Sequence, residues 1–423
     1  MSSLLIQTLF WSSLTLVTYT YAGYPLILWL LSRRREIQAP EESRASRNSP
    51  LPRVSIVIAA YREESVILER LNNLAKLDYP SDQLEILIGC DGNEDLTGEL
   101  VSTYDNAQIR LIQFEPRRGK ASVLNDCVPQ AAGEIIVFSD ANTNMDPQCI
   151  KQLVRHFQDE TIGCVCGQLI LEDPTTGKNV DGLYWKYENF LKHCETKLGA
   201  VLGVNGALYA LRKSLYSSLP AETVNDDFLI GMRVHLAGRR IIYDDTAFAR
   251  EETATSVHAE FKRRIRIGTG AFQSLKHLKG LLNPKHGYVA FAFWSHKLLR
   301  WLCPAFMLMA LVANLCLIQS PIYQMTLLAQ GLFYLSAFVG MKFVNGNRYL
   351  KLCRVPGMFV QMNLALGIGF CRWLSIRQTG IWDRTERSQT VTLPVDDQNL
   401  TIPDIAPQNS EFSESELTHS SKS

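Results

Sequence analysis

The first apolar segment places the strongest constraint on the fold of this chain. Residues 4–31 contain no charged side chain, and Arg33, Arg34 and Arg35 follow them directly. A helix of about 20 apolar residues is long enough to cross the hydrocarbon core of a membrane. A cleaved secretory signal carries its positive charge before the apolar core, not after it. We therefore expect residues 1–35 to form an uncleaved transmembrane anchor, with the arginines on the cytoplasmic side.

Apolar character returns after residue 286. Residues 287–300 mix aromatic and apolar positions with basic ones, which is typical of an amphipathic helix at a membrane surface. The stretches 301–318 and 322–343 are long and apolar enough to cross. We therefore predict an interfacial helix at 287–300 and C-terminal membrane segments within 301–376.

The stretch 355–374 leaves two topologies open. If it crosses the membrane, the tail that follows lies outside the cell. Basic residues flank the stretch at both ends, however, and such residues favour the cytoplasm. We expect it to enter the membrane without crossing, or to lie along it. Residues 377–423 are expected to form a tail, disordered after about residue 388, because they are rich in Ser, Asp, Glu and Gln.

Residues 52–286 have the pattern of a soluble α/β domain, joined to the anchor by a linker at 36–51. Short apolar strands alternate with helical patterns from residue 53 to residue 139, which predicts a doubly wound, mostly parallel sheet with right-handed crossovers. The formal net charge of the chain is +1, so its field gives no reason to expect nucleic acid as a partner. The ten cysteines form no complete zinc-ligand pattern and are expected to be reduced.

Acidic and amide side chains follow the predicted strands at the positions where open α/β sheets bind ligands. Asp91 ends one strand, Asp140 and Asn142 follow another, and Asp226 and Asp227 form a third group. Taken singly, such residues are common in turns and helix caps. Their oxygens are also the hard ligands that hold divalent cations. Together they predict a site for a metal-bound, phosphate-bearing ligand.

Six motifs occur in a fixed order along the domain. They are Ala59-Ala60-Tyr61-Arg62-Glu63, Asp91 with Asp95, Arg118-Gly119-Lys120-Ala121 with Asn125, Asp140-Ala141-Asn142, Asn225-Asp226-Asp227 and Arg263-Arg264-Ile265-Arg266. In this order they resemble the membrane-bound family 2 glycosyltransferases with a GT-A fold, in particular the branch of cellulose, hyaluronan and poly-N-acetylglucosamine synthases. The resemblance extends over roughly residues 52–387.

The resemblance implies an inverting enzyme that transfers a sugar from a nucleotide-sugar, with a UDP-sugar expected, to a membrane-associated saccharide or lipid. Such an enzyme would use Mg²⁺ or Mn²⁺ and would act in cell-surface polysaccharide or glycolipid synthesis. It would be a multi-pass protein of the plasma membrane with its catalytic domain in the cytoplasm. Its partners would be the donor, a lipid-linked or polymeric acceptor, membrane lipids and, as one option, an export subunit.

The resemblance also implies roles for single residues. Those that would contact the nucleotide-sugar are Ala60, Glu63, Asp91, Lys120, Asp140, Arg263 and Arg266. Asp140 would also hold the cation. Asn142 stands where a second aspartate is commoner, so it would either ligate the cation without adding charge or contact the donor.

Asp227 matches the last residue of the family's Thr-Glu-Asp motif and would be the general base for the acceptor hydroxyl. Asp226 beside it would raise its pKa, which suits a base. The alternative role is capping of the helix that follows, above all for Asp226. Asn205-Gly206-Ala207 falls where relatives line the acceptor site, although a turn is the simpler interpretation.

One departure from the family bears on the product. Ile267 stands where the processive synthases carry a tryptophan that serves as a platform for the acceptor sugar. This argues against processivity, so a processive polysaccharide synthase is the alternative rather than the first interpretation. A catalytically silent membrane assembly subunit is a further alternative, which the presence of Asp140 and Asp227 disfavours.

Overall fold

The computed structural model describes residues 3–35, 50–173, 176, 179, 182–253, 257–343 and 352–375. The expected linker lies almost entirely outside these residues, and the expected tail lies wholly outside them.

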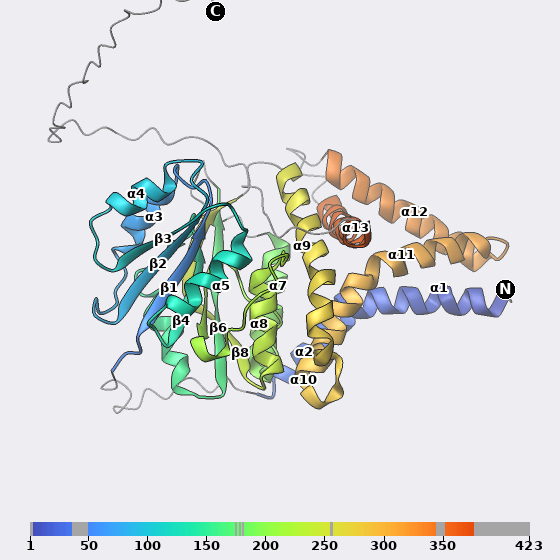
Figure 1. The fold of residues 1–423 in the computed structure, drawn as a ribbon. Coiled ribbons are helices and arrows are strands. Elements are labelled where there is room, and N and C mark those ends of the chain that lie inside the picture. Colours follow the sequence, from blue (N-terminus) through green and yellow to red (C-terminus); the bar gives the residue numbers. More distant parts are fainter. Residues whose placement is uncertain are drawn as a thin grey trace, which may run out of the picture. The chain divides into compact units, whose positions relative to one another are not determined.

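A mixed eight-stranded sheet forms the centre of the part of the α/β domain that the structure describes (Figure 1). Its order is β3-β2-β1-β4-β7-β6-β8-β5. The strands are β1 (Val54–Ala60), β2 (Leu84–Asp91), β3 (Ile109–Phe114), β4 (Ile135–Asp140), β5 (Asn144–Met145), β6 (Ile162–Glu172), β7 (Tyr209–Arg212) and β8 (Arg240–Glu252). Strands β1 to β4 pair in parallel, as do β6 and β8, which confirms the predicted α/β class. Strand β7 runs antiparallel to both of its neighbours, which the simple β-α alternation does not predict.

Helices cover both faces of this sheet, and the strand sequences explain why. Every residue of β1 is buried, as expected for a parallel strand covered on two sides. Ile56 and Ile58 belong to one core, whereas Val57 and Ala59 belong to the other. The first core is shared with α3 (Ile67–Leu74), α4 (Thr97–Thr103) and α6 (Cys149–Val154), and the second with α5 (Lys120–Gln130), α7 (Leu183–Leu198) and α8 (Asp226–Leu236).

Strand β8 contains a bulge that realigns the second half of the sheet. Gly167 of β6 pairs with Asp244, but the next residue, Gln168, pairs with Phe248. A Cβ on Gly167 would lie 2.8 Å from the carbonyl oxygen of Ala247, so the bulge passes where only glycine leaves room. Beyond the bulge, β8 pairs with the short strand β5. The bulge therefore sets the position of the turn between β4 and β5, which contains Asn142.

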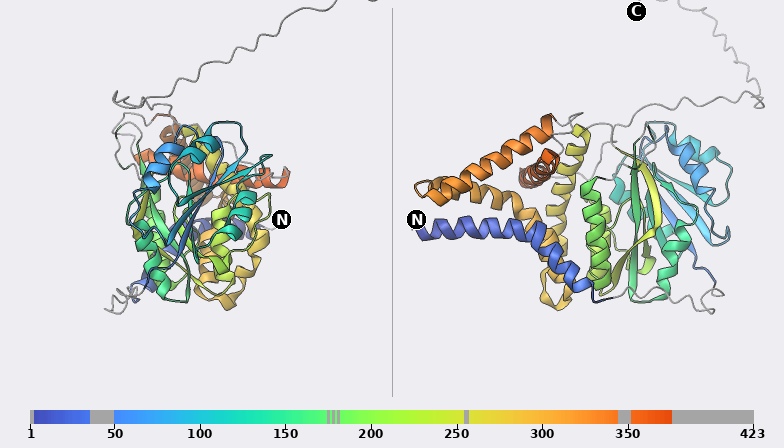
Figure 2. Two further views of the ribbon diagram at one scale, coloured as in Figure 1. Left: turned by 60° about the vertical axis from the view of Figure 1, so that its left-hand side comes forward. Right: turned by 180° about the vertical axis from the view of Figure 1, so that it is seen from behind.

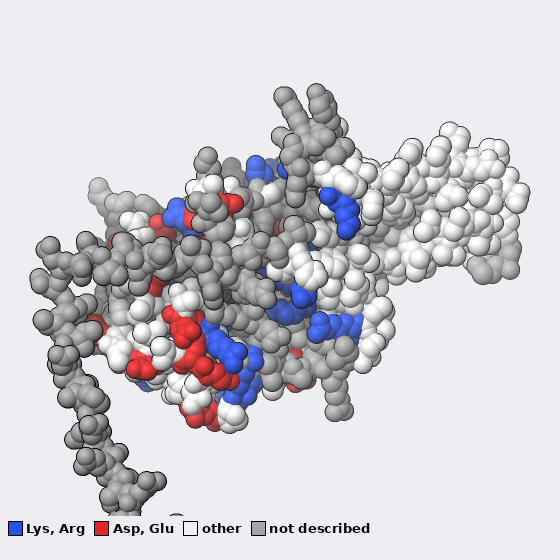
Figure 3. Space-filling view, turned by 90° about the horizontal axis from the view of Figure 1, so that it is seen from above, with Lys and Arg blue, Asp and Glu red and all other residues white. Residues whose placement is uncertain are grey.

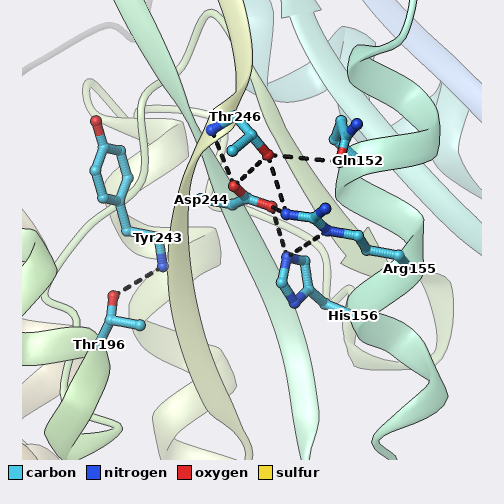
Figure 4. A network of polar contacts seen from close by, with 7 residues as sticks. All are labelled: Gln152, Arg155, His156, Thr196, Tyr243, Asp244 and Thr246. Atoms are coloured by element: carbon cyan, nitrogen blue, oxygen red, sulfur yellow. Dashed lines mark hydrogen bonds and ion pairs between the residues drawn. The ribbon is translucent and has the colours of Figure 1, made fainter. Parts of the chain in front are cut away.

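A buried carboxylate fixes this bulge in place (Figure 4). Asp244 is 6% exposed, and its Oδ2 lies 2.6 Å from Nε2 of His156 and 2.8 Å from Nη2 of Arg155. Its Oδ1 accepts hydrogen bonds from the backbone N–H and the hydroxyl of Thr246, at 2.9 and 2.7 Å. Burial alone would raise the pKa of Asp244, but the hydrogen bonds from His156 and Thr246 hold this pKa well below its usual range.

In the described residues, three helical runs are long and apolar enough to cross a membrane. The first, Ser3–Ser32, comprises α1 (Ser3–Thr18), a π-helical turn and α2 (Tyr24–Ser32). The second, Tyr288–Cys316, comprises α10 (Tyr288–Ala292), a π-helical turn and α11 (Leu299–Cys316), and the third is α12 (Pro321–Lys342). On the face drawn in Figure 3, the part of the molecule that projects away from the α/β domain shows neither acidic nor basic side chains. These runs make the chain a membrane protein.

The second run includes most of the residues expected to form an interfacial helix at 287–300, and their position at the membrane surface stays a prediction. Helix α10, the π-helical turn and α11 follow one another without a break, so no helix end separates these residues from the span. The polar residues His296 and Arg300 of this run are buried, at 4% and 9% exposure. Both contact α7, so they join the run to the α/β domain.

Helix α13 (Arg354–Ser375), which includes the stretch 355–374, is not among the three runs. It packs along α9 (Val257–Leu278), and the contact is close (Figure 2). A Cβ on Gly369 would lie 2.9 Å from the carbonyl oxygen of Ile265, and the hydroxyl of Thr269 donates to the Gly369 carbonyl at 3.2 Å. Glycine therefore lets the two backbones touch, and α13 fixes the position of the helix that carries Arg263 and Arg266.

We expect Asp244→Asn to lower the free energy of unfolding by about 2–3 kcal/mol, because it removes the negative charge from a buried network. The depressed pKa of Asp244 contributes stability that is complete above the unfolded pKa of about 3.9 and is lost as the pH falls below it. Wild type should thus lose stability below about pH 4 more steeply than the variant. Thermal unfolding of the full chain in detergent, followed by circular dichroism between neutral pH and acid, measures both effects.

The neighbouring Asp245 provides the control, because its side chain is 52% exposed and lies 3.4 Å from His193. Asp245→Asn should change stability by less than about 0.5 kcal/mol. Equal stability of Asp244→Asn and wild type at neutral pH would show that the network does not hold the bulge.

Candidate active site

The carboxyl ends of β1, β2 and β4 lie next to each other at one edge of the sheet. In the strand register, Ala60 pairs with Cys90, which precedes Asp91, and Ala59 pairs with Asp140. Two of the predicted acidic positions are therefore brought to the same edge, as expected for parallel strands.

Lys120 connects this edge to the third acidic group. It is the first residue of α5, and its Nζ lies 2.7 Å from Oδ1 of Asp140 and 3.5 Å from Oδ2 of Asp226. Burial alone would lower the pKa of Lys120, but the charges of Asp140 and Asp226 raise this pKa above its usual value. The lysine therefore stays charged and joins the end of β4 to the start of α8.

Asp226 and Asp227 occupy the first turn of α8, after the N-cap residue Asn225. Oδ1 of Asp227 accepts a hydrogen bond from the backbone N–H of Phe228 at 2.7 Å. Burial, and next the charge of Asp226, raise the pKa of Asp227 to about 6, whereas Lys120 acts in the opposite direction. A carboxylate with this pKa is ionised at neutral pH and can still accept a proton, which suits a general base.

Arg266 is the basic residue of α9 that the acidic group influences. Burial, and next the charge of Arg263, lower the pKa of Arg266, whereas Asp226, Asp140 and Asp227 act in the opposite direction. Arg263 itself is ion-paired with Glu260, at 3.4 Å. The side chain of Asn225 donates to the carbonyl oxygen of Ile267 at 2.9 Å, which links the acidic motif to the basic helix.

Asp91 makes contacts that its position in the sequence does not predict. It is 1% exposed, and its two oxygens accept hydrogen bonds from the backbone N–H groups of Arg118 and Gly119, at 2.7 and 2.8 Å. Gly119 has φ of 91°, a conformation that favours glycine. Asp91 therefore holds the loop that leads into Lys120.

Two further candidates lie in the turn after β1. The side chain of Ala60 is buried, so only its backbone lies at the edge of the sheet. Glu63 is 8% exposed, and its backbone N–H donates to the hydroxyl of Thr97 at 2.8 Å. Contact of these two residues with a nucleotide-sugar stays a prediction.

The described residues contain no group of three or more His, Cys, Asp or Glu side chains that could hold a metal ion. Asp140 is the one predicted metal ligand with a carboxylate, and Asn142 follows it in the partly buried turn before β5. A cation here would need its remaining ligands from a bound diphosphate and water. Mg²⁺ commonly has that coordination in nucleotide sites.

A buried arginine beneath this turn is a residue that the sequence analysis did not identify. Arg70 of α3 is 2% exposed, and its guanidinium donates to Oγ of Ser139 at 2.8 Å and to Oδ1 of Asn73 at 2.6 Å. Asn73 in turn donates to the carbonyl oxygen of Met145 at 2.8 Å and accepts from its N–H at 3.0 Å. Arg70 and Asn73 thus hold both ends of the segment from Ser139 to Met145, within which Asp140 and Asn142 lie.

The charge of Arg70 also acts on the site. Burial lowers the pKa of Arg70 to about 10, and the charge of Asp140 is among those that oppose this shift. The same attraction stabilises the anionic form of Asp140. A signal exists in the sequence: Arg70 lies between Ile67, Leu71 and Leu74 on the apolar face of its helix, where an arginine is rare unless it has buried partners.

Comparison with known proteins agrees with this geometry. Two curated relatives are poly-β-1,6-N-acetyl-D-glucosamine synthases, from Staphylococcus aureus strain COL, 26% identical, and from Staphylococcus epidermidis, 24% identical, each over 229 residues. The matched region is 52% of this chain and 55% of each relative, so the chain spans about half the length of these relatives.

Among solved structures, a mannosyltransferase from Pyrobaculum calidifontis in complex with GDP-Man and Mn²⁺ has the same fold. Its TM-score is 0.65 at 21% identity, and the superposition covers 87% of this chain and 99% of that one. A family model described as "Glycosyltransferase like family 2" matches residues 52–270, which is more than half of the 423 residues. With the GT-A fold and the ordered motifs also in place, the chain belongs to the family 2 glycosyltransferases.

Proposed function

We propose that this enzyme is an inverting glycosyltransferase that transfers a sugar from a UDP-sugar to a saccharide or lipid acceptor at the membrane. The observation that carries the proposal is the convergence of Lys120 and Arg266 on Asp140, Asp226 and Asp227 at the carboxyl edge of the sheet. Basic side chains suit a diphosphate, and a carboxylate with a raised pKa suits deprotonation of an acceptor.

In this proposal, the donor lies across the ends of β1, β2 and β4. Lys120 and Arg266 contact the diphosphate, while Asp91 acts by fixing the loop before Lys120. Asp140, with Asn142, holds Mg²⁺ or Mn²⁺, which would neutralise charge on the leaving diphosphate. The mannosyltransferase of the same fold was solved with Mn²⁺, which supports a divalent ion.

Asp227 acts on the acceptor. Its carboxylate removes the proton of the attacking hydroxyl, and the hydroxyl oxygen forms a bond to the anomeric carbon from the face opposite the diphosphate. The bond from that carbon to the diphosphate breaks, its electron pair leaves with the nucleoside diphosphate, and the configuration is inverted. Gly206 supports this placement, because a Cβ there would lie 3.2 Å from Oδ2 of Asp227, on the segment expected to line the acceptor site.

We assign the catalytic domain to residues 52–286 and place it in the cytoplasm of a multi-pass plasma-membrane protein. The charge that follows the first span supports this orientation. Ile267, which is 42% exposed, supports limited transfer over processive synthesis. A hydrolysis screen over UDP- and GDP-sugars with the purified full chain tests the activity and shows whether the donor carries uracil or guanine. No hydrolysis of any of them would favour a silent assembly subunit instead.

Asp227→Asn should lower turnover by roughly 10²–10⁴-fold, the usual share of general-base catalysis, while donor affinity changes little. Transfer by the wild type should rise with pH through an apparent pKa near 6, which belongs to the coupled carboxylates. Lys120→Met should shift that midpoint to higher pH, because it removes the opposing positive charge. Initial rates measured from pH 5 to pH 8 check both effects.

Asp105 is an exposed aspartate of the same domain, and Asp105→Asn is the matched control. It should keep both the rate and the midpoint. If Asp227→Asn transferred sugar within a few-fold of the wild-type rate, Asp227 would not be the base.

Asp140→Ala should remove the dependence of UDP binding on a divalent ion. Without the cation the diphosphate faces uncompensated carboxylates, so the wild type should bind UDP about tenfold or more weakly in EDTA than in Mg²⁺. Asn142→Asp should tighten ion binding if Asn142 is a ligand. Calorimetric titration of UDP with Mg²⁺, with Mn²⁺ and with EDTA measures these effects, and equal wild-type affinity in all three would exclude the ion.

Arg70→Met should weaken Mg²⁺-dependent UDP binding several-fold, because it removes the hydrogen bonds to Ser139 and Asn73 that hold the segment carrying Asp140 and Asn142. Arg70→Lys should restore the charge but not both hydrogen bonds, so it should recover the affinity only in part. Arg53→Met, at an exposed position before β1, is the control and should bind UDP as the wild type does. Titration of UDP in Mg²⁺ measures these affinities, and wild-type affinity of Arg70→Met would show that Arg70 does not support the site.

A further inference from the structure

Polar residues near the start of the second membrane run contact α7 of the catalytic domain. The run has 29 residues, whereas about 20 suffice to cross the hydrocarbon core. About nine residues are therefore available at the level of the lipid headgroups. His296, Lys297 and Arg300 lie at or next to this part of the run, where an ionised lipid headgroup is also located.

Two of these residues, Arg300 and His296, contact carboxylates of α7. Nη1 of Arg300 lies 2.6 Å from Oε1 of Glu188. Nδ1 of His296 lies 2.7 Å from Oε1 of Glu195, which also accepts from the hydroxyl of Tyr24 at 2.9 Å. These contacts join the first and second membrane runs to the catalytic domain. They use the carboxylates of Glu188 and Glu195.

Two lysines in the same region form no ion pair with a carboxylate among the described residues. Among the described residues, neither Lys192 of α7 nor Lys297 lies within 4.0 Å of a carboxylate oxygen. Nζ of Lys192 donates to Oδ1 of Asn205 at 2.5 Å. Nζ of Lys297 lies 5.6 Å from the ring centroid of Phe228 and 4.0 Å from the position of a Cβ on Gly203. Both ammonium groups therefore border the segment 203–206.

That segment leads directly to the proposed base. Gly206 approaches Oδ2 of Asp227, and Phe228, which Lys297 approaches, is the next residue after Asp227. The two positive charges, neither of which lies within 4.0 Å of a carboxylate oxygen among the described residues, thus border the segment next to Asp227, whereas Lys120 contacts Asp140 and Asp226 at the edge of the sheet. Lys120 is ion-paired with the donor-side carboxylates, so it does not compensate an anion on the acceptor side.

We propose that Lys192 and Lys297 bind the phosphate or diphosphate of a lipid-linked saccharide, which is the acceptor. The inference rests on the proposed function and names the chemical class of its acceptor. An ammonium group is an effective point charge for phosphate. An anionic headgroup at this position would give both lysines a counter-charge in direct contact, in addition to the more distant charges of Glu188 and Glu195 that act on Lys297, while its lipid chain stays in the membrane next to α10 and α11.

The base indicates which group of the acceptor is the nucleophile. A lipid monophosphate is already ionised at neutral pH, because its second pKa is about 6, and its oxygen could attack without a base. A sugar hydroxyl needs its proton removed. With Asp227 as the proposed base beside the acceptor segment, the attacking group of this proposal is a hydroxyl, and the phosphate serves for recognition.

The test measures binding of polyprenyl phosphate, neutral polyprenol and phosphatidylglycerol to the full chain in detergent, by native mass spectrometry. Wild type should bind polyprenyl phosphate about tenfold or more tightly than polyprenol, since one ionic hydrogen bond accounts for that factor. Lys297→Met and Lys192→Met should each reduce this preference, and Lys297→Arg should keep it. Lys285→Met, at an exposed lysine just before the same membrane run, should also keep it.

Equal binding of the phosphate and the alcohol by wild type would overturn the proposal, as would a preference that survives both Met substitutions together. If phosphatidylglycerol binds as tightly as polyprenyl phosphate and is lost in the same variants, the lysines bind bulk lipid and the acceptor assignment is overturned. Hydrolysis of the donor without acceptor tests the proposed function separately. If the enzyme hydrolyses the donor but does not prefer polyprenyl phosphate over polyprenol, only this inference is overturned and the proposed function stands.

Discussion

The ion pairs of Lys120 are the interaction on which the rest of the site depends. One ammonium group contacts Asp140 at the end of β4 and Asp226 at the start of α8. At an effective dielectric constant of 20, two unit charges 4 Å apart interact by about 4 kcal/mol, so carboxylates gathered here without a cation would repel each other strongly. Asp91 holds the loop before Lys120, and the helix that follows fixes its direction. The fold thus uses the ends of β2 and β4 and the start of α8 to place a single positive charge.

The first half of the sheet could be predicted from the sequence because β1, β2 and β4 are almost fully buried and therefore appear as continuous apolar runs. Asp91 and Asp140 were identified because parallel strands bring their carboxyl ends together, whereas Lys120 was identified from the family resemblance. The direction of β7 could not be predicted in this way, since a short apolar strand has the same pattern in either orientation. The bulge in β8 could not be predicted either. It depends on the close approach of Gly167 to the carbonyl of Ala247 and on the contacts of Asp244 with Arg155 and His156, in the turn after α6.

The contacts of buried polar side chains were the hardest part to foresee. Asp91 was predicted to contact the nucleotide-sugar, and the sequence did not show that both of its oxygens also bind backbone N–H groups. Arg70 was not considered, although it supports the turn that carries Asp140. The segment 287–300 was predicted to be an interfacial helix, and the contacts of His296 and Arg300 with α7 were not foreseen. In each case the residue type was informative, and the partner came from an element far away in the sequence.

The membrane helices complete the site rather than only anchor it. Helix α9 carries Arg266, and its position depends on α13, which it meets where Gly369 allows the two backbones to touch. Helix α7 is fixed from the other side by Arg300 and His296. In the function that we propose, the sheet determines where the donor binds, whereas the helices packed between the sheet and the membrane runs determine where an acceptor can approach Asp227. Activity would then be coupled to membrane insertion, because loss of the membrane contacts would displace Arg266 and the acceptor segment while leaving Lys120 and Asp140 in place.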